Sequence, residues 1–174
     1  MVEGNLSIIT KEKVSLPKLR EIRGSLIIGR GSPPSVSLPA LTTITEGLSV
    51  YQSALASFDA GKLRNVGTDL GVERNEHLTD LNLPSLETTG LWLSVRSNPK
   101  LRQFKLPKLR VVGGRFQVFD NPSAETYSFP ELYLVKMPFT MDAIQCDDPL
   151  ITRLAEANPS LDITVSGGNC GSMP

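Results

Sequence analysis

The stretch Phe104-Lys-Leu-Pro-Lys-Leu109 decides the fold, because related copies of it recur along the chain at a nearly fixed spacing. The apolar residues that open the copies lie 22, 22, 23, 23 and 23 residues apart. They are Val14, Val36, Phe58, Leu81, Phe104 and Tyr127. The third copy is degenerate, since glycine replaces its proline. A period between about 20 and 50 residues is typical of a solenoid, in which one coil cannot bury its apolar side alone.

A second motif begins seven residues after the leucine that closes each copy. It is a triplet with apolar ends, such as Leu93-Ser-Val95, and a further apolar column that includes Ile44 and Val112 lies between the two motifs. Alternation of apolar and polar residues is the period of a half-buried strand. We therefore predict a mainly β fold over residues 1–145: a parallel β-helix, or leucine-rich solenoid, of about six 22–23-residue coils.

Three residue types recur at fixed places in the coils. Proline is expected to end the first strand, because it cannot donate to a strand ladder. Glycine, as at Gly90, marks a bend that a side chain would obstruct. Asparagine recurs at Asn75, Asn98 and Asn121. We interpret these asparagines as an inward ladder whose amides satisfy backbone groups in the turns.

Residues 146–174 are expected to form a C-terminal cap of the same domain. Asp148-Pro149 predicts a helix over about 149–157, with an acidic N-cap and proline at the first position. A final strand is expected over about 161–165, and solenoids need such a cap to cover the last open coil. A Cys146–Cys170 disulfide would fasten the cap and indicate an oxidising compartment. Two buried free thiols are the alternative.

Composition and charge narrow the possible partners. Lys and Arg together number 18, as do Asp and Glu, so no basic excess favours binding to nucleic acid or to an acidic membrane surface. No apolar run reaches 18 residues, so we expect no membrane insertion by this segment. No signal peptide is visible, and residues 4–8 resemble part of a coil already under way. We therefore expect sequence upstream of this segment.

The consensus Leu-Pro-x-Leu-x-x-Ile-x-Gly-x-Leu-x-Ile-x-x-Asn-x-x-Leu resembles the receptor L domain. That domain is the leucine-rich right-handed β-helix of the insulin and epidermal growth factor receptor ectodomains. The repeats are also similar to those of fungal GPI-anchored cell-wall proteins and of microbial surface proteins. The resemblance covers about residues 4–145, and it is best over residues 81–98 and 104–121. It implies that the β-helix of this chain is right-handed, and it also implies a surface or secreted setting and recognition by a sheet face or its rim.

The chain also departs from the animal receptors. They carry several disulfides in and around their L domains, whereas this chain has two cysteines. Growth-factor binding is therefore not carried over to any residue of this chain.

The sequence favours a non-enzymatic protein without a metal or cofactor. His77 is the only histidine, and no Gly-x-Ser-x-Gly motif accompanies it. A polysaccharide-active β-helix enzyme is a remote alternative, which would need carboxylates that converge on one face. Asp59 and Asp69 are expected on different sheets of one coil, while Asp120 and Asp142 fall at turns or strand edges.

The outward positions of the second strand are richer in aromatic residues and arginine than those of the first. Such residues on a flat exposed face are typical of a contact with protein or sugar. We therefore predict a binding face with six residues: Tyr51, Glu73, Trp92, Arg96, Arg115 and Phe119. The alternative is that Trp92 and Phe119 are covered by a neighbouring loop or a further domain.

The expected function is that of a recognition or adhesion module, at a cell surface, in a cell wall or secreted, which binds a protein or carbohydrate ligand. The alternative is a structural component of a cell wall or envelope with no dedicated ligand. Asn5-Leu-Ser7 is an N-glycosylation sequon, and a glycan on Asn5 would be consistent with secretion.

Overall fold

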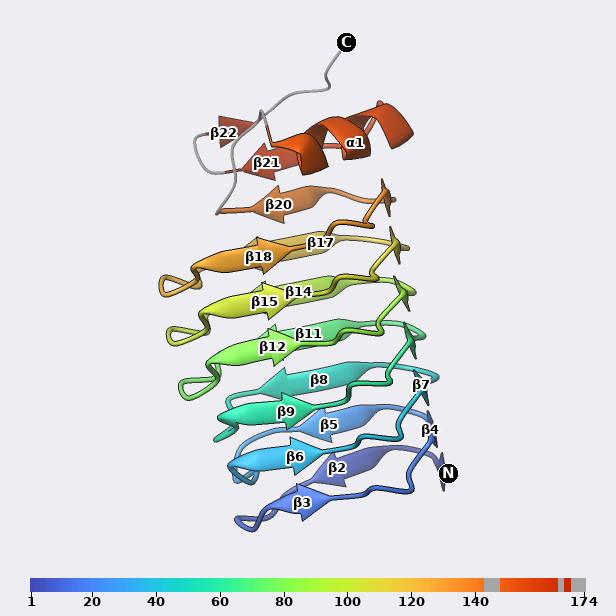
Figure 1. Cartoon of the computed structure of the whole chain (residues 1–174), viewed down its shortest axis with the longest axis vertical. Helices are drawn as coiled ribbons and strands as arrows, with labels where there is room; N and C mark the ends of the chain where they lie inside the picture. Colours follow the sequence, from blue (N-terminus) through green and yellow to red (C-terminus); the bar gives the residue numbers. More distant parts are fainter. Residues whose placement is uncertain (143–147, 166–167, 170–174) are drawn as a thin grey trace.

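The computed structural model describes residues 1–142, 148–165 and 168–169, which form a parallel β-solenoid capped by a helix (Figure 1). The predicted fold class is confirmed. We number the coils from the apolar residue that opens each sequence copy, so coil 1 opens at Val14 and coil 4 at Leu81. Residues 2–8 add two strands of a preceding turn, which brings the number of turns to about seven.

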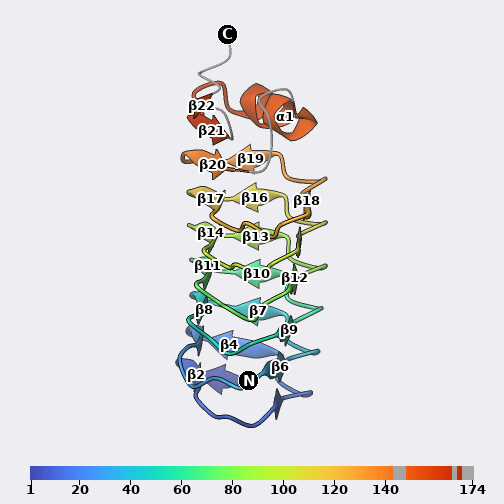
Figure 2. The same ribbon diagram turned by 90° about the vertical axis from the view of Figure 1, so that its left-hand side faces the viewer.

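Each coil contributes three strands, and equivalent strands stack into sheets. Sheet A has seven strands: β1 (Val2–Glu3), β4 (Glu21–Arg23), β7 (Thr43–Ile44), β10 (Asn65–Val66), β13 (Thr88–Thr89), β16 (Val111–Val112) and β19 (Leu134–Val135). Figure 2 shows β4, β7, β10, β13 and β16 stacked in one column. Sheet B has nine strands: β2 (Leu6–Ile8), β5 (Leu26–Ile28), β8 (Leu48–Tyr51), β11 (Leu70–Glu73), β14 (Leu93–Arg96), β17 (Phe116–Phe119), β20 (Phe139–Met141), β21 (Ile163–Val165) and β22 (Gly168–Asn169).

The first strands of the coils form two short sheets instead of one. Sheet C contains β3 (Val14–Ser15), β6 (Ser35–Ser37) and β9 (Ser57–Asp59), and sheet D contains β12 (Asp80–Asn82), β15 (Gln103–Lys105) and β18 (Thr126–Ser128). The break lies between coil 3, which opens with the degenerate sequence copy, and coil 4. Each strand of sheet D is followed by a residue and then a proline, as at Leu106-Pro107, so proline lies just outside the ladder as predicted.

The register of the sheets turns each sequence column into a column of neighbouring side chains. In sheet B, Leu70 pairs with Leu48 on one side and with Leu93 on the other, and Leu93 pairs with Phe116. These side chains point inward and are fully buried. Near the C-terminal end the core becomes aromatic, where the rings of Phe116 and Phe139 stack with centroids 4.7 Å apart. Burial of these apolar columns is the main favourable term in folding.

The asparagine ladder is confirmed, and it links successive coils. The Oδ1 atom of Asn98 accepts hydrogen bonds from the backbone N–H of Asn75 (3.1 Å) and from its Nδ2 (3.0 Å). The Nδ2 atom of Asn98 donates to the carbonyl oxygen of Val72 (3.0 Å) and to Oδ1 of Asn121 (3.1 Å). Ser53 begins the ladder by donating its hydroxyl to Oδ1 of Asn75. Each buried amide thereby satisfies backbone groups in the coils beside it.

The cap follows the sequence prediction closely. Helix α1 spans Pro149–Ala157, and Asp148 is its N-cap, whose carboxylate accepts the N–H of Leu150 at 2.8 Å. Strand β21 then pairs in parallel with β20 and so extends sheet B over the last coil. Within the described ranges, no helix has both the length and the apolar character needed to cross a membrane.

A glycine column lets the coils approach closely at the corner between sheets A and B. A Cβ atom built on Gly90 would overlap the carbonyl oxygen of Gly67, and one on Gly113 would overlap that of Gly90. Gly71, in the middle of β11, is different, because a Cβ there meets no heavy atom within 4 Å. The stacking of the backbone therefore requires glycine at positions 90 and 113, but it does not require glycine at position 71.

We expect Gly90→Ala to lower the free energy of unfolding by about 2–4 kcal/mol, because the new methyl group forces two hydrogen-bonded coils apart. Gly71→Ala is the matched control, and it should change stability by less than about 0.5 kcal/mol. Urea unfolding followed by circular dichroism measures both. Equal midpoints for the two variants would contradict the close-approach argument.

Asn98→Ala should cost about 2–4 kcal/mol of stability, since it leaves the backbone N–H of Asn75 and the carbonyl of Val72 buried without these partners. Asn82→Ala removes an exposed asparagine from the outer face of β12 and is expected to be nearly neutral. Thermal unfolding compares the two. A neutral result for Asn98→Ala would mean that the ladder does not stabilise the coils.

Candidate binding groove on the outer face of sheet B

Four of the six predicted binding residues form one row across four successive coils. Tyr51, Glu73, Arg96 and Phe119 are the last residues of β8, β11, β14 and β17, and the register places each beside the next. All four point away from the core, since the residues before them in each strand are buried. The structure therefore brings these residues together, as the strand alternation predicts.

The other two predicted residues lie at the opposite edge of the same face. Trp92 precedes β14 and Arg115 precedes β17, and the N–H of Leu93 donates to the carbonyl oxygen of Arg115 at 2.9 Å. Trp92 is 55% exposed, so no described loop covers its ring. Phe119 and Arg115 are half-buried. Cover by a neighbouring loop is thus excluded for Trp92 within the described part of the chain, and cover by a further domain stays an open alternative.

The row of four is held together by charge and hydrogen bonding. Nη2 of Arg96 donates to Oε2 of Glu73 at 2.9 Å, and the hydroxyl of Ser94 donates to Oε1 of Glu73 at 2.8 Å. The guanidinium carbon of Arg96 also lies 5.9 Å from the centroid of the Phe119 ring, within the range of a cation–π contact. Arg96 therefore neutralises Glu73 and contacts Phe119 at the same time.

The surroundings of Glu73 shift the pKa of its carboxyl group. Partial burial alone would raise this pKa, but the hydrogen bonds from Arg96 and Ser94 and the positive charge of Arg96 outweigh it and lower the pKa below its ordinary value. The same hydrogen bond has the opposite effect on its partner and raises the pKa of Arg96. The pair is ionised at neutral pH.

A hollow lies beside this row, because the middle positions of the strands are small. Ser49 of β8, Gly71 of β11 and Ser94 of β14 are neighbours in register. A hollow of about 420 Å³ opens over Ser49 and Gly71, and Tyr51, Gln52, Glu73 and Arg74 complete its lining. The absence of a side chain at Gly71 keeps this part of the face concave.

The hollow continues toward the beginning of the strands. An adjoining hollow of about 490 Å³ shares Ser49 and Gly71 with the first and reaches Ser25 and Ile27 of coil 1. Its far end is lined by Glu46 and Asp69, which precede β8 and β11. Asp69 accepts the backbone N–H of Trp92 at 3.2 Å, so the backbone of this exposed residue adjoins this end.

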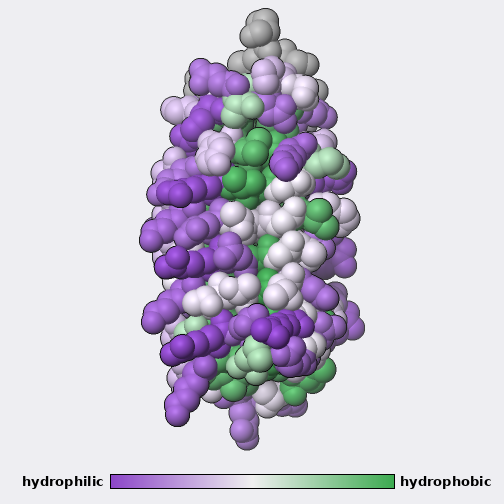
Figure 3. Space-filling model, turned by 90° about the vertical axis from the view of Figure 1, so that its right-hand side faces the viewer, coloured by the Kyte–Doolittle hydropathy of each residue, from purple (hydrophilic) through white to green (hydrophobic). Residues whose placement is uncertain are grey.

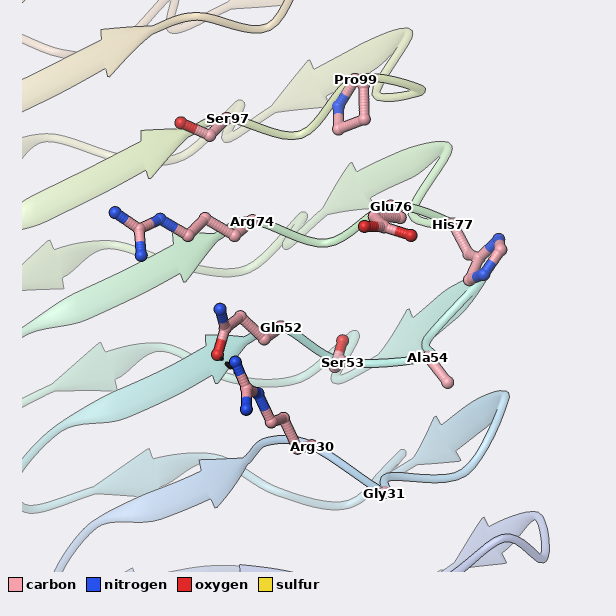
Figure 4. A pocket seen from close by; sticks show the side chains of 10 residues that line it. All are labelled: Arg30, Gly31, Gln52, Ser53, Ala54, Arg74, Glu76, His77, Ser97 and Pro99. Carbon is pink, nitrogen blue, oxygen red and sulfur yellow. Dashed lines mark hydrogen bonds between the residues drawn. The ribbon is translucent and has the colours of Figure 1, made fainter.

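The hollow also continues around the end of the strands. A pocket of about 570 Å³ shares Gln52 and Arg74 with the central hollow and extends to Arg30, His77 and Pro99 (Figure 4). It lies where the coils change length. In coils 3 to 5 the last loop has one more residue than in coils 1 and 2, and the loops before β12, β15 and β18 project beyond those before β6 and β9 (Figure 1).

The backbone at this corner adopts an uncommon conformation that repeats in four coils. Among the residues that the structure describes, positive φ angles occur at four non-glycine positions, each just after a sheet B strand: Gln52 (45°), Arg74 (56°), Ser97 (54°) and Asp120 (56°). Such angles are uncommon for residues with side chains. They turn the chain out of sheet B, and Gln52 and Arg74 line two of the hollows as a result.

We call the three connected hollows the sheet B groove. The principal residues that line this groove are Arg30, Glu46, Ser49, Tyr51, Gln52, Asp69, Gly71, Glu73 and Arg74. Tyr51 and Glu73 of the predicted set line it, Trp92 and Arg96 border it on coil 4, and Arg115 and Phe119 lie one coil further away. The sequence did not single out Arg30, Gln52 or Arg74. The change of repeat length from 22 to 23 residues was the feature of the sequence that could have pointed to these three residues.

The outer face of sheet A differs from that of sheet B. Figure 3 shows a strip of weakly polar residues between hydrophilic ones, which becomes apolar toward the C-terminal end. Its outward positions are Thr43, Asn65 and Thr88 in the middle coils and Val111 and Leu134 beyond them. None of the hollows of the groove includes these residues.

The carboxylates considered for catalysis do not gather in the groove. Asp59 lies on the outer face of sheet C, whereas Asp69 lies beside sheet B. Asp120 and Asp142 are neighbours at a corner, where the N–H of Asp120 donates to Oδ2 of Asp142 at 2.7 Å. Over residues 1–142, 148–165 and 168–169, no three His, Cys, Asp or Glu side chains form a group that could hold a metal ion.

Two further predicted features concern modification. Cys146 and Cys170 lie outside the described residues, so their disulfide stays a prediction. Asn5 is exposed at the start of the solenoid, and its Oδ1 accepts the N–H of Ser25 at 2.8 Å.

Comparisons of the chain with protein-family models, with curated proteins and with solved structures find no match.

We expect Glu73→Gln to reduce stability at pH 7 by less than about 1 kcal/mol, as for other partly exposed ion pairs. Because the pKa of Glu73 is lowered by folding, its carboxylate stabilises the fold above the pKa of the unfolded chain. This contribution is lost as the pH falls through the folded pKa, so the difference should shrink as the pH is lowered from 7 through the acid range. Urea unfolding across this pH range checks the prediction.

Glu87→Gln is the control, because the ion pair of Glu87 with Arg64 is longer, at 3.9 Å, and its side chain is more exposed. Its effect at pH 7 should be smaller. A pH-independent difference for Glu73→Gln would show that the interaction with Arg96 is not electrostatic.

Proposed function

We propose that this protein is a non-enzymatic recognition module, which binds a protein or a carbohydrate through the sheet B groove. The observation that supports this most is the groove itself. Three hollows with shared lining residues follow the outer face of sheet B and the corner at the end of its strands, and the exposed Tyr51 lines the central one. Concave sites with a few convergent polar groups are the usual place for ligands.

The residues around the groove suit recognition. Tyr51 is 44% and Trp92 55% exposed, and both rings present apolar area with a polar atom at one end. The ring of Tyr51 lies against Gly29 of the preceding coil, where a Cβ would come within 3.0 Å of it. Tyr51 is thus positioned in advance, which reduces the entropy lost on binding.

We place this activity at a cell surface, in a cell wall or outside the cell. The resemblance of the repeats to the receptor L domain and to fungal and microbial surface proteins supports this setting. A Cys146–Cys170 disulfide and a glycan on Asn5 belong to the same proposal, because both form in oxidising, secretory compartments.

A structural component of a cell wall or envelope is the second candidate. The regular register of sheets A and B and the asparagine ladder favour it, because they make a stiff rod that needs no ligand to be useful. The groove distinguishes the two functions, since a spacer has no use for a concave face lined by charged and aromatic side chains.

The test begins with a binding screen of the intact chain against glycan and protein arrays, and two variants then locate the site. Trp92→Ala combined with Arg96→Ala removes the border of the groove, and Gly71→Gln fills its floor. Glutamine fits there because it occupies the equivalent position at Gln117, and a Cβ on Gly71 meets no atom. Both variants should weaken binding about tenfold or more.

Asn82→Ala combined with Lys105→Ala, on the outer face of sheet D, is the control and should leave affinity unchanged. Circular dichroism confirms that each variant is folded. A saturable ligand whose affinity is the same for Gly71→Gln and wild type would reject the groove as the binding site. No saturable ligand in either array would favour the structural function.

A further inference from the structure

The sheet B groove has charges of opposite sign at its two ends. Glu46 and Asp69 line one end, and Arg30 and Arg74 line the other. Glu76 also lines the pocket at the arginine end, but it lies on the side of His77, away from the guanidinium groups (Figure 4). Asp69 and Arg74 lie five residues apart along one extended segment, which corresponds to about 16 Å. A ligand that fills the groove therefore meets carboxylates at one end and guanidinium groups at the other.

At the end of the groove lined by Arg30 and Arg74, the guanidinium groups keep N–H donors that a ligand could use. Arg30, Gln52 and Arg74 come from three successive coils, and their side chains extend to the same side, away from His77 (Figure 4). Nε of Arg30 donates to Oε1 of Gln52 at 2.8 Å, which leaves its terminal N–H groups. Within the described ranges, neither Arg30 nor Arg74 has a carboxylate within ion-pair distance. The neighbouring Glu73 is neutralised by Arg96.

The carboxylate end selects against a second anion. Glu46 accepts the hydroxyl of Ser25 at 3.0 Å, and Asp69 accepts the N–H of Trp92, so each carboxylate keeps further acceptor sites toward the groove. Such acceptors suit hydroxyl donors. Trp92, whose side chain is exposed, is joined to Asp69 through its backbone N–H at this end.

The backbone around the groove favours a sugar over an extended peptide. The main-chain groups of β8, β11 and β14 are engaged with the strands on either side. A peptide laid on this face therefore cannot gain the main-chain hydrogen bonds of strand addition. A sugar brings its own hydroxyl groups, which match the hydroxyls and carboxylates of the groove, and its apolar ring face suits Trp92 and Tyr51.

We propose that the groove binds a short oligosaccharide whose sugar at one end carries an anionic group, a carboxylate or a sulfate. The anionic group lies between Arg30 and Arg74, and neutral sugars lie over Gly71 and toward Glu46 and Asp69. This inference rests on the proposed recognition function and specifies the ligand of the same site.

The experiment titrates the intact chain with three probes by calorimetry. They are lactose, sialyllactose, which adds a sugar with a carboxylate, and lactose that carries a sulfate. Both anionic probes, or one of them, should bind at least about tenfold more tightly than lactose, and this difference should shrink as salt is added. The two anionic arms show which anion the arginines prefer.

The test variant is Arg30→Gln combined with Arg74→Asn, because asparagine tolerates the positive φ of residue 74. It should lose the preference for the anionic probe and keep the affinity for lactose. Arg20→Gln combined with Arg102→Gln makes the same change in net charge at two exposed arginines outside the groove, and should keep the preference.

Three outcomes would overturn the inference. Lactose could bind as tightly as the anionic probes, both double variants could lose the preference equally, or a glutamate-rich peptide could bind more tightly than any sugar. If no sugar binds while Gly71→Gln abolishes binding of a protein ligand, the recognition function stands and the sugar assignment fails. If a ligand binds saturably but Gly71→Gln leaves its affinity unchanged, the groove is not the binding site, and if no ligand binds at all, the recognition function itself fails.

Discussion

Every feature of this molecule depends on backbone hydrogen bonds between coils in strict register. The N–H of Leu48 donates to the carbonyl oxygen of Asp69 at 2.8 Å, and the N–H of Leu70 donates to that of Trp92 at the same distance. Because these bonds repeat at each coil, a position in the sequence repeat becomes a column along the axis. Leucine columns become core, asparagine columns become ladders and glycine columns become close contacts between backbones.

The sequence therefore predicted the repeating features of the structure well. The spacing of Leu81 and Phe104 predicted their pairing, Asp148-Pro149 predicted the start of the helix, and the alternation in β14 predicted that Arg96 points outward. Each of these inferences needs only local chemistry and a period. The split of the first strands into two sheets was not predicted, because it depends on how a degenerate copy and a one-residue insertion combine in space.

The candidate site was predicted only in part, for the same reason. Tyr51 and Glu73 were found because aromatic and charged residues stand out at outward positions. The groove depends instead on what is missing at Gly71 and on the positive φ of Arg74, which places its side chain over the sheet. A missing side chain and a turn of the backbone are both hard to recognise from the amino-acid sequence. The repeated residues of a solenoid reveal its scaffold, whereas its individual features come from residues that depart from the repeat.

The break between β9 and β12 leaves the boundary between coils 3 and 4 with fewer ladders than any other boundary among the six coils. Sheets A and B cross this boundary, but the first strands do not pair there, although the hydroxyl of Ser85 donates to the carbonyl oxygen of Gly61 at 2.8 Å. Under tension along the axis, two ladders resist separation at this place, whereas three resist it between coils 4 and 5. Among the boundaries between the six coils, this seam would therefore part first in a stretched molecule, and the fragment that holds coils 1 to 3 would take most of the groove with it.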